Sequence, residues 1–225
     1  MMAKMLLNKI LMSRKEGESL EDTKNEIYGK QLRRLISGGG YLAPDIAEKF
    51  FEMGITTGQG YGMSECSPKI SAPDYGRIDK LASVGRLVKG CKVRIVDGEI
   101  QVQSPSVMKG YYKNPEATAE VFTKDGWFRT GDLGEFDKDG YLYIKGRLKN
   151  MILGPSGENI YPEEIEKVIN DIEEVNESIV MQRGGKLVAL VTFNDNVIDW
   201  DQQGEEEFFK KLEGYKQRIL SIVNK

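Results

Sequence analysis

The spacing of hydrophobic residues changes twice along this chain of 225 residues, near residues 83 and 148. Before the first change, a buried strand at 32–36, a glycine-rich turn, a helix opened by Pro44 and a second strand at 55–57 are expected. A β-loop-α-β unit of this kind usually belongs to a parallel sheet, because the helix returns the chain to start a neighbouring strand in the same direction. This part of the chain is therefore predicted to be α/β.

The later regions have other periods. Between 83 and 147, apolar and polar residues alternate and Asp97-Gly98 supplies a hairpin turn, which predicts a small antiparallel β-barrel or sheet. From 148 to 225, a helix after Pro162, a hairpin around Gly184-Gly185 and a last helix predict a small α+β domain. The helix after Pro162 should pack through four apolar side chains, those of Ile165, Val168, Ile169 and Ile172. The last helix is marked by apolar residues at helical spacing: Phe208, Phe209, Leu212, Tyr215 and Ile219.

The N-terminal segment 1–31 is predicted to be a helix followed by a loop, and 32–82 to be the βαβ part. Met2, Met5, Leu6 and Ile10 fall at helical spacing, and the polar run 16–26 has the composition of a loop. Lys9 interrupts the apolar run, and no stretch approaches the roughly 20 apolar residues of a membrane span. A solvated amphipathic helix is favoured over a membrane anchor.

The composition excludes several kinds of function. The chain has no histidine, which excludes Ser-His-Asp and Cys-His chemistry, histidine general bases and histidine metal sites. The net charge of −3 gives no positive field that would attract nucleic acid, and two cysteines cannot form a disulfide framework. Any catalysis must therefore use carboxylates, Lys, Arg, hydroxyls, backbone amides or a metal held by carboxylates.

Two glycine-rich segments can bring the backbone close to a ligand. The amides of SGGG (37–40) can cradle an anion or a ring edge, or the segment can simply be a structural turn. In GQGYGMSE (58–65), Tyr61 can stack on a flat base, Ser64 can bond a phosphate oxygen and Glu65 can hold Mg²⁺. The alternative is an ordinary glycine-rich loop with a surface glutamate.

Two later segments offer charged groups. In GWFRTGD (126–132), Asp132 can accept two hydrogen bonds from a ribose cis-diol, or it can cap its own turn. In GRLKNMILGPSGENIYPEEIE (146–166), Arg147 offers a fixed fork of donors for ribose or phosphate oxygens. Lys149 lies where a hinge would be, and 154–159 suits a mobile loop. The alternative for this run is a surface arginine, a linker and a helix begun by proline.

In this order, SGGG, GYGMSE, GEIQVQSPSVMKGYY (98–112), WFRTGD and the run from GR to GENIYPEEIE resemble the adenylate-forming (AMP-binding) superfamily. That superfamily includes acyl-CoA synthetases, the adenylation domains of peptide synthetases and luciferases. The resemblance runs from about Leu32 to Glu166 and continues more weakly to the end. The residues from 114 to 150 look most like bacterial long-chain fatty acid–CoA ligases. The fold it implies is the end of the large adenylate-forming domain, followed by a truncated small C-terminal domain.

By position, the resemblance implies a role for each motif residue. Asp132 would hold the ribose hydroxyls, Arg147 would add a ribose or phosphate contact, and Lys149 would be the hinge of the small domain. Ser64 would touch phosphate and Glu65 would bind Mg²⁺, both as catalytic residues. The nucleotide would be bound further by a larger set: Gly38, Gly39, Gly40, Tyr41, Tyr61 and Gly62.

The activity that the resemblance implies is an AMP-forming acid–thiol ligase. ATP and a fatty acid would give acyl-AMP and pyrophosphate, and the CoA thiol would then displace AMP, with Mg²⁺ as the metal. Neither half needs a histidine. The partners would be small molecules, with no nucleic acid and no obligate protein partner. The enzyme would be cytoplasmic, and its acyl substrate would allow peripheral association with a membrane.

The chain departs from the family pattern in two serious ways and one mild way. The Ser/Thr/Gly-rich phosphate loop ending in lysine and the late catalytic lysine are not found in it, and Ser64 stands where threonine is common. We therefore expect little or no ligase activity from this chain by itself. The alternatives are an adenylation domain that serves a carrier protein and a non-catalytic nucleotide-binding or interaction module.

Overall fold

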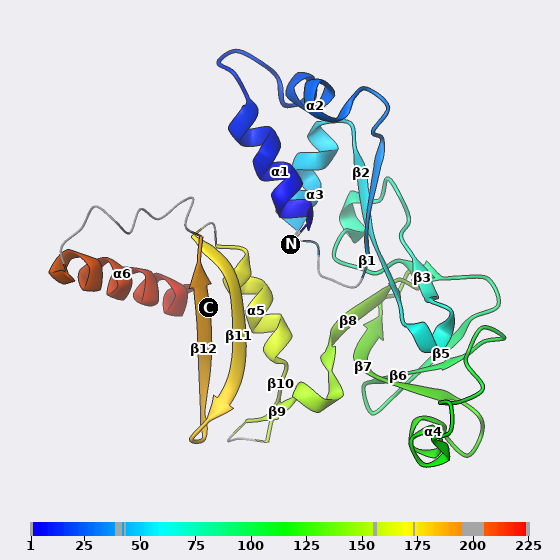
Figure 1. Cartoon of the computed structure of the whole chain (residues 1–225). Coiled ribbons are helices and arrows are strands. Elements are labelled where there is room, and N and C mark those ends of the chain that lie inside the picture. The colour runs from blue at the N-terminus through cyan, green and yellow to red at the C-terminus, as the bar shows by residue number, and fades with distance from the viewer. Residues whose placement is uncertain are drawn as a thin grey trace. The chain divides into compact units, whose positions relative to one another are not determined.

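Figure 1 shows the computed structural model, which describes residues 2–38, 42, 44–154, 157–172, 174–194 and 205–223. The chain divides into two compact units, Met1–Ile144 with two hydrophobic core clusters and Lys145–Lys225 with one. The units are described one at a time. None of the described helices is both long and apolar enough to cross a membrane.

The first unit contains the predicted β-loop-α-β arrangement. Strands β1 (Arg34–Gly38) and β2 (Thr56–Gly62) pair in parallel, and helix α3 (Pro44–Glu52) lies between them in sequence. The parallel pair belongs to a mixed sheet, because β3 (Lys69–Ala72) adds to β2 antiparallel and β4 (Arg86–Leu87) adds to β3 in the same way. The strand positions need a correction: β1 starts two residues later than expected and includes Gly38 of the SGGG turn.

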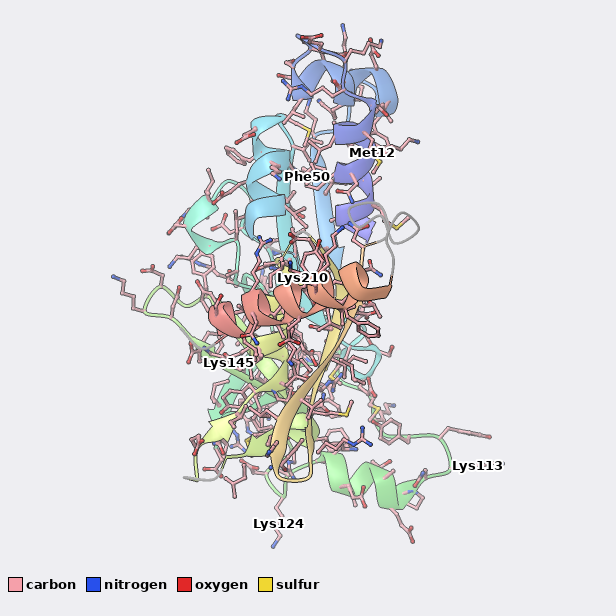
Figure 2. The ribbon with its side chains drawn as sticks, turned by 90° about the vertical axis from the view of Figure 1, so that its left-hand side faces the viewer. Met12, Phe50, Lys113, Lys124, Lys145 and Lys210 are labelled. Carbon is pink, nitrogen blue, oxygen red and sulfur yellow. The ribbon has the colours of Figure 1, made fainter. Side chains whose placement is uncertain are left out.

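The N-terminal helix is present as α1 (Met2–Ser13), but the loop predicted over 16–26 is wrong, because most of it belongs to helix α2 (Leu20–Tyr28). Ser19 caps this helix by accepting a hydrogen bond from the amide of Asp22 at 3.1 Å. Acidic residues in its first turn interact favourably with the positive end of the helix dipole. The apolar side chains of α2 pack on the core shared by α1 and α3. Phe50, in that core, lies on the side of α3 that faces α1 (Figure 2).

A four-stranded sheet follows, ordered β5-β6-β7-β8, which is the sheet alternative of the prediction. Its strands are β5 (Lys92–Val96), β6 (Glu99–Gln103), β7 (Phe128–Phe136) and β8 (Leu142–Arg147). The β5/β6 and β6/β7 pairs are antiparallel. Ile100, Val102 and Phe128 share one core with Ile70 of β3, so the two sheets of this unit are packed together. Helix α4 (Pro115–Val121) joins β6 to β7, and Lys113 and Lys124 on either side of it point outward (Figure 2).

The second unit contains the predicted helix, hairpin and last helix. Helix α5 (Pro162–Asn170) packs on the antiparallel hairpin of β11 (Val175–Arg183) and β12 (Lys186–Phe193). Two short strands, β9 (Ile152–Leu153) and β10 (Asn159–Ile160), precede α5, and α6 (Glu205–Val223) ends the described chain.

One detail of the predicted helix face is wrong. Val168 of α5 is 41% exposed and does not belong to the core; Phe209 of α6 is likewise exposed. The core of this unit consists of Ile169, Ile172, Val175 and Val180, with Ile219 of α6 packed against it. Ile172 is buried as predicted, although it lies beyond the end of α5. Phe208 cannot be compared, because its side chain lies outside the described part of the structure.

Candidate functional site

The GYGMSE and WFRTGD segments meet in the first unit at a hydrogen bond between Tyr61 and Asp132. The Tyr61 hydroxyl donates to Asp132 Oδ2 at 2.5 Å, across 71 residues of sequence. Tyr61 extends from β2, and Asp132 lies in β7 with only 6% of its surface exposed. A hydrogen bond to an ionised carboxylate is stronger than one between neutral groups. The structure thus brings together an aromatic ring and a carboxylate that the sequence analysis assigned to one nucleotide.

The Tyr61 hydroxyl remains a donor over the whole physiological pH range. Burial raises its pKa above the ordinary value for tyrosine, and the negative charge of Asp132 raises this pKa further. The ring packs against the core of the first unit while part of the side chain stays exposed. Tyr61 therefore holds one oxygen of Asp132 in a fixed direction.

The backbone before Asp132 is held to strand β6. Gly131 adopts a φ of 70°, a backbone conformation that residues with a Cβ rarely adopt. On one side of it, Thr130 Oγ1 donates to the Ile100 carbonyl at 2.8 Å and accepts from the Asp132 amide at 3.1 Å. In the peptide before the glycine, the Gly131 amide donates to Glu99 Oε1 at 3.3 Å. The turn therefore has a partner on each side of its glycine.

Ser64 and Glu65 begin a short 3-10 turn, Ser64–Cys66, just after β2. A side chain at Gly62 would place its Cβ 1.6 Å from the Pro68 carbonyl oxygen, so only glycine fits where the chain bends into this turn. Glu65 Oε1 accepts a hydrogen bond from the Tyr111 hydroxyl at 3.1 Å, and the Glu65 carbonyl accepts from the Met108 amide at 2.7 Å. These contacts tie the turn to the segment that precedes α4.

One residue of this turn, Glu65, could supply a single ligand to a magnesium ion that a nucleotide also holds. Within the described residues, no cluster of three or more His, Cys, Asp or Glu side chains could hold a metal. Magnesium in nucleotide sites usually takes one or two carboxylates and completes its shell with phosphate oxygens and water. Glu65 is partly exposed and uses Oε1 toward Tyr111, so its carboxylate suits the role of a single protein ligand.

Cys66, beside Glu65, is not a nucleophile at neutral pH. It is buried, and burial raises the pKa of its thiol to about 12. The nearby Cys91 and the charge of Glu65 add smaller effects in the same direction. The thiol therefore stays protonated and contributes to the hydrophobic core of the first unit.

The boundary between the units falls within β8, so Arg147, at the end of that strand, belongs to the second unit together with Lys149, and both residues are exposed. The Arg147 amide and the Asn150 side chain donate to Glu163 Oε1 of α5, at 3.3 Å and 2.7 Å. The segment proposed as a hinge is thus held by a glutamate that the sequence analysis did not single out. The convergence of Arg147 with Asp132 on one sugar stays a prediction, as does the hinge role of Lys149.

The SGGGY segment is described only at its edges. Gly38 ends β1, whereas Gly39, Gly40 and Tyr41 lie outside the described residues. The next described residue, Leu42, is held by the buried side chain of Gln59: its amide donates to Gln59 Oε1 at 2.9 Å, and its carbonyl accepts from Gln59 Nε2 at 3.3 Å. Gln59 therefore joins the segment after SGGGY to the GYGMSE strand.

Sequence reasoning missed four polar residues that hold the candidate site in place: Gln59, Glu99, Tyr111 and Glu163. Glu99 and Tyr111 fall within the quoted segment 98–112, whose residues were matched as a motif without separate roles. The partners of Gln59, Glu99 and Tyr111 are 17 to 46 residues away in sequence, so no local spacing pointed to these pairs. For Glu163, a carboxylate in the first turn of a helix begun by proline was the only available signal.

Comparisons with known proteins show which proteins this chain is similar to. A sequence profile of the family described as AMP-binding enzyme matches residues 1–112. A feruloyl-CoA synthase of Amycolatopsis sp is 42% identical over 147 residues, which are 60% of this chain and 30% of that protein. The long-chain-fatty-acid–CoA ligase FadD15 of Mycobacterium tuberculosis is 34% identical over 181 residues, 79% of this chain and 30% of the relative.

Solved structures show the same likeness. The o-succinylbenzoate-CoA synthetase MenE of Bacillus subtilis, in complex with its acyl-adenylate intermediate OSB-AMP, has a TM-score of 0.69 at 28% identity. That likeness covers 90% of this chain and 44% of the MenE chain. The same synthetase in complex with ATP and a magnesium ion has a TM-score of 0.66 at 28% identity, over 85% of this chain and 44% of that one. The chain spans 30 to 42% of the length of the curated relatives it matches.

Proposed function

Because the chain belongs to the AMP-binding enzyme family, we propose that it carries the ribose-binding part of the active site of an AMP-forming acid–thiol ligase. The observation that carries this proposal is the Tyr61–Asp132 hydrogen bond, which joins two motifs far apart in sequence. A buried carboxylate beside an aromatic ring suits the ribose and base of one nucleotide. Complexes of MenE with OSB-AMP and with ATP and magnesium support the choice of ligand.

Each residue has a separate part in this proposal. Asp132 accepts hydrogen bonds from the ribose 2′- and 3′-hydroxyls, and the Tyr61 ring lies against the adenine. Ser64 is exposed at the start of its turn and donates its hydroxyl to a phosphate oxygen. Glu65 supplies one ligand to magnesium, and the phosphates and water supply the others. Arg147 adds donors for ribose or phosphate oxygens.

The proposed reaction has two halves. In the first, a carboxylate oxygen of the acid attacks the α-phosphorus of ATP, forming acyl-AMP and releasing pyrophosphate. In the second, the CoA sulfur attacks the acyl carbon, the bond to AMP breaks and the thiol proton is lost. Magnesium neutralises phosphate charge when it is bound. Negative charge builds on phosphate oxygens in the first half, so donors and cations that face these oxygens contribute most to the rate.

We propose a long-chain fatty acid as the acid substrate. The residues from 114 to 150 resemble fatty acid–CoA ligases, and the relative FadD15 aligns with 79% of the chain. An aromatic acid is the second candidate, because the feruloyl-CoA synthase is 42% identical over 147 residues. Competition between non-hydrolysable palmitoyl and feruloyl adenylate analogues for this chain separates the two: tighter binding of the feruloyl analogue would reject the fatty acid.

Calorimetric titration of AMP tests the proposed nucleotide site without requiring catalysis. A hydrogen bond to a charged acceptor contributes about 1.5–3 kcal/mol, so Asp132→Ala should weaken AMP binding by roughly tenfold to a hundredfold. Asp125→Ala is a matched control, because Asp125 lies in the same hairpin region but pairs with Arg94 at the surface. Equal AMP affinity of the wild-type and Asp132→Ala proteins would remove Asp132 from the site and defeat the proposal.

A further inference from the structure

A row of polar side chains crosses the β5–β7 part of the sheet on the face opposite the core. The polar row consists of Arg94 on β5, Gln101 and Glu99 on β6, and Arg129 on β7. Residues that alternate with these, such as Ile100 and Phe128, are fully buried in the core, as the two-residue period of a strand requires. Within the polar row, Glu99 and Gln101 are themselves only 5% exposed.

The side chains of the polar row are joined by hydrogen bonds that run from Arg94 through Gln101 to Glu99, and Glu99 in turn bonds the Gly131 amide. Arg94 Nε donates to Gln101 Oε1 at 2.8 Å, and Gln101 Nε2 donates to Glu99 Oε2 at 3.4 Å. Arg129 Nε donates to the same Glu99 oxygen at 2.9 Å. The other oxygen of Glu99, Oε1, accepts from the Gly131 amide. Both carboxylate oxygens of Glu99 are therefore in use.

A buried carboxylate contributes little net stability to a sheet, because its charge must be removed from water. Removing its charge from water costs several kcal/mol unless a cation and hydrogen-bond donors compensate. Arg129 supplies that cation here, and an apolar pair of similar size often gives equal or greater stability. The presence of Glu99 at this position is better explained by what its second oxygen holds, which is the peptide amide of Gly131, next to Asp132.

Together with the Tyr61 hydrogen bond, this peptide sets the direction of the Asp132 side chain. Gly131 has no Cβ and adopts a positive φ, so its own sterics restrict the turn less than those of another residue would. Thr130 ties one side of the glycine to the Ile100 carbonyl, and Glu99 ties the amide of the glycine itself. With either tie removed, the chain before Asp132 gains freedom, and the carboxylate loses its fixed direction relative to Tyr61.

We propose that Glu99 is a positioning residue for ribose recognition: it holds the Gly131 amide so that Asp132 presents its carboxylate in the direction that the ribose hydroxyls require. This inference rests on the proposed function. Glu99 does not touch the nucleotide, and Arg129 serves it by compensating its charge. The consequence is a defined phenotype, in which ribose discrimination is lost while binding of the rest of the nucleotide is kept.

The test compares AMP with 2′-deoxy-AMP and 3′-deoxy-AMP in calorimetric titrations of the whole chain. In the wild-type protein, loss of either hydroxyl should weaken binding about tenfold, the value of one hydrogen bond to a charged acceptor. Glu99→Gln has the same shape, but its NH₂ group must face either the Gly131 amide or Arg129, both of which are donors. We expect the penalty for a missing hydroxyl to fall to about twofold in this variant.

A second substitution should restore the preference. In the double variant Glu99→Gln/Arg129→Gln, the two carboxamides can bond to each other, which frees the carboxamide oxygen at position 99 to accept from Gly131 again. The penalty for a missing hydroxyl should return to near tenfold. Arg94→Gln is the matched control at the far end of the polar row, and it should leave the penalty unchanged even where it lowers stability.

The outcomes separate this inference from the proposed function. If wild-type protein does not bind AMP, or if Asp132→Ala binds it equally well, the proposed function fails and the role of Glu99 fails with it. If Asp132 behaves as expected but Glu99→Gln weakens the binding of all three nucleotides by the same factor, Glu99 is merely structural and only this inference is overturned.

Should Glu99→Gln not fold, Glu99→Asp carries the same test, because it keeps the charge but moves the carboxylate away from the Gly131 amide. A wild-type ribose preference in Glu99→Asp would then overturn the proposal.

Discussion

Asp132 and Glu65, the two carboxylates of the proposed site, each accept a hydrogen bond from a tyrosine hydroxyl, but their surroundings differ. Asp132 is 6% exposed, lies in a strand and is 2.5 Å from the Tyr61 hydroxyl. Glu65 is partly exposed, lies in a 3-10 turn and is 3.1 Å from the Tyr111 hydroxyl. The side chains of Thr130 and Glu99 tie the backbone before Asp132 to β6. The Glu65 turn is instead held to the segment before α4 by a backbone hydrogen bond.

The difference matches what each ligand would require. A ribose diol presents two hydroxyls at a fixed spacing, so an acceptor that is already aimed loses little entropy on binding. Magnesium requires near-octahedral geometry, most of which phosphates and water supply, so a carboxylate that can adjust its position suits it better. If the proposed roles hold, the sugar acceptor is built before the nucleotide arrives, while the metal ligand completes its site with the nucleotide.

The largest expected effect comes from Asp132→Asn. The carboxamide keeps the shape of the side chain but loses the charge and one acceptor oxygen, so AMP and ATP–Mg²⁺ should both bind at least about tenfold more weakly. Calorimetric titration with each nucleotide measures this. A loss confined to ATP–Mg²⁺ would place Asp132 with the metal and reverse the two roles.

Glu65→Gln should have a smaller and metal-dependent effect. One ionised ligand among several is removed from magnesium, so ATP–Mg²⁺ should bind about threefold to tenfold more weakly. AMP in the presence of a chelator should bind as it does to the wild-type protein, because its ribose contacts are intact. Weaker binding of AMP without metal would show that Glu65 touches the nucleotide directly.

Tyr61→Phe tests whether the Asp132 region is preformed. The substitution removes the donor to a buried carboxylate, so the free energy of unfolding should fall by about 1.5–3 kcal/mol. Urea denaturation of the free protein measures this change. If the unfolding free energy stays at the wild-type value, the bond does not hold Asp132 in place and the contrast with Glu65 disappears.

Tyr111→Phe should have the smallest effect. The Tyr111 hydroxyl and the Glu65 carboxylate meet where water can replace either partner, so the free energy of unfolding should fall by about 0.5 kcal/mol or less. The same urea denaturation, performed in parallel with Tyr61→Phe, gives the ratio of the two effects. A drop as large as that of Tyr61→Phe would mean that both carboxylates are equally fixed.

Local sequence patterns predicted the elements of the fold better than their exact limits. The β-loop-α-β unit, the hairpin at Asp97-Gly98 and the helix after Pro162 were identified from periodicity and turn residues, which act over a few positions. The segment 16–26 was mistaken for a loop, because its polarity concealed a cap at Ser19 and a few apolar side chains that tertiary contacts bury. Val168 was assigned to the buried face of α5, but that face is narrower than the spacing suggested, because the neighbouring Ile169 is buried and Val168 is exposed.

For the candidate site, the sequence alone determined which chemical groups are available: no histidine, a carboxylate after a Thr-Gly turn, and a tyrosine and a glutamate in a glycine-rich segment. Only the tertiary structure decided that Tyr61 meets Asp132, that Tyr111 meets Glu65, and that Glu99 holds the Gly131 amide. The physical reason is range. Residue chemistry and turn preference are local properties, whereas these contacts join residues 32 to 71 positions apart, and strand pairing and the packing of a shared core bring those residues together.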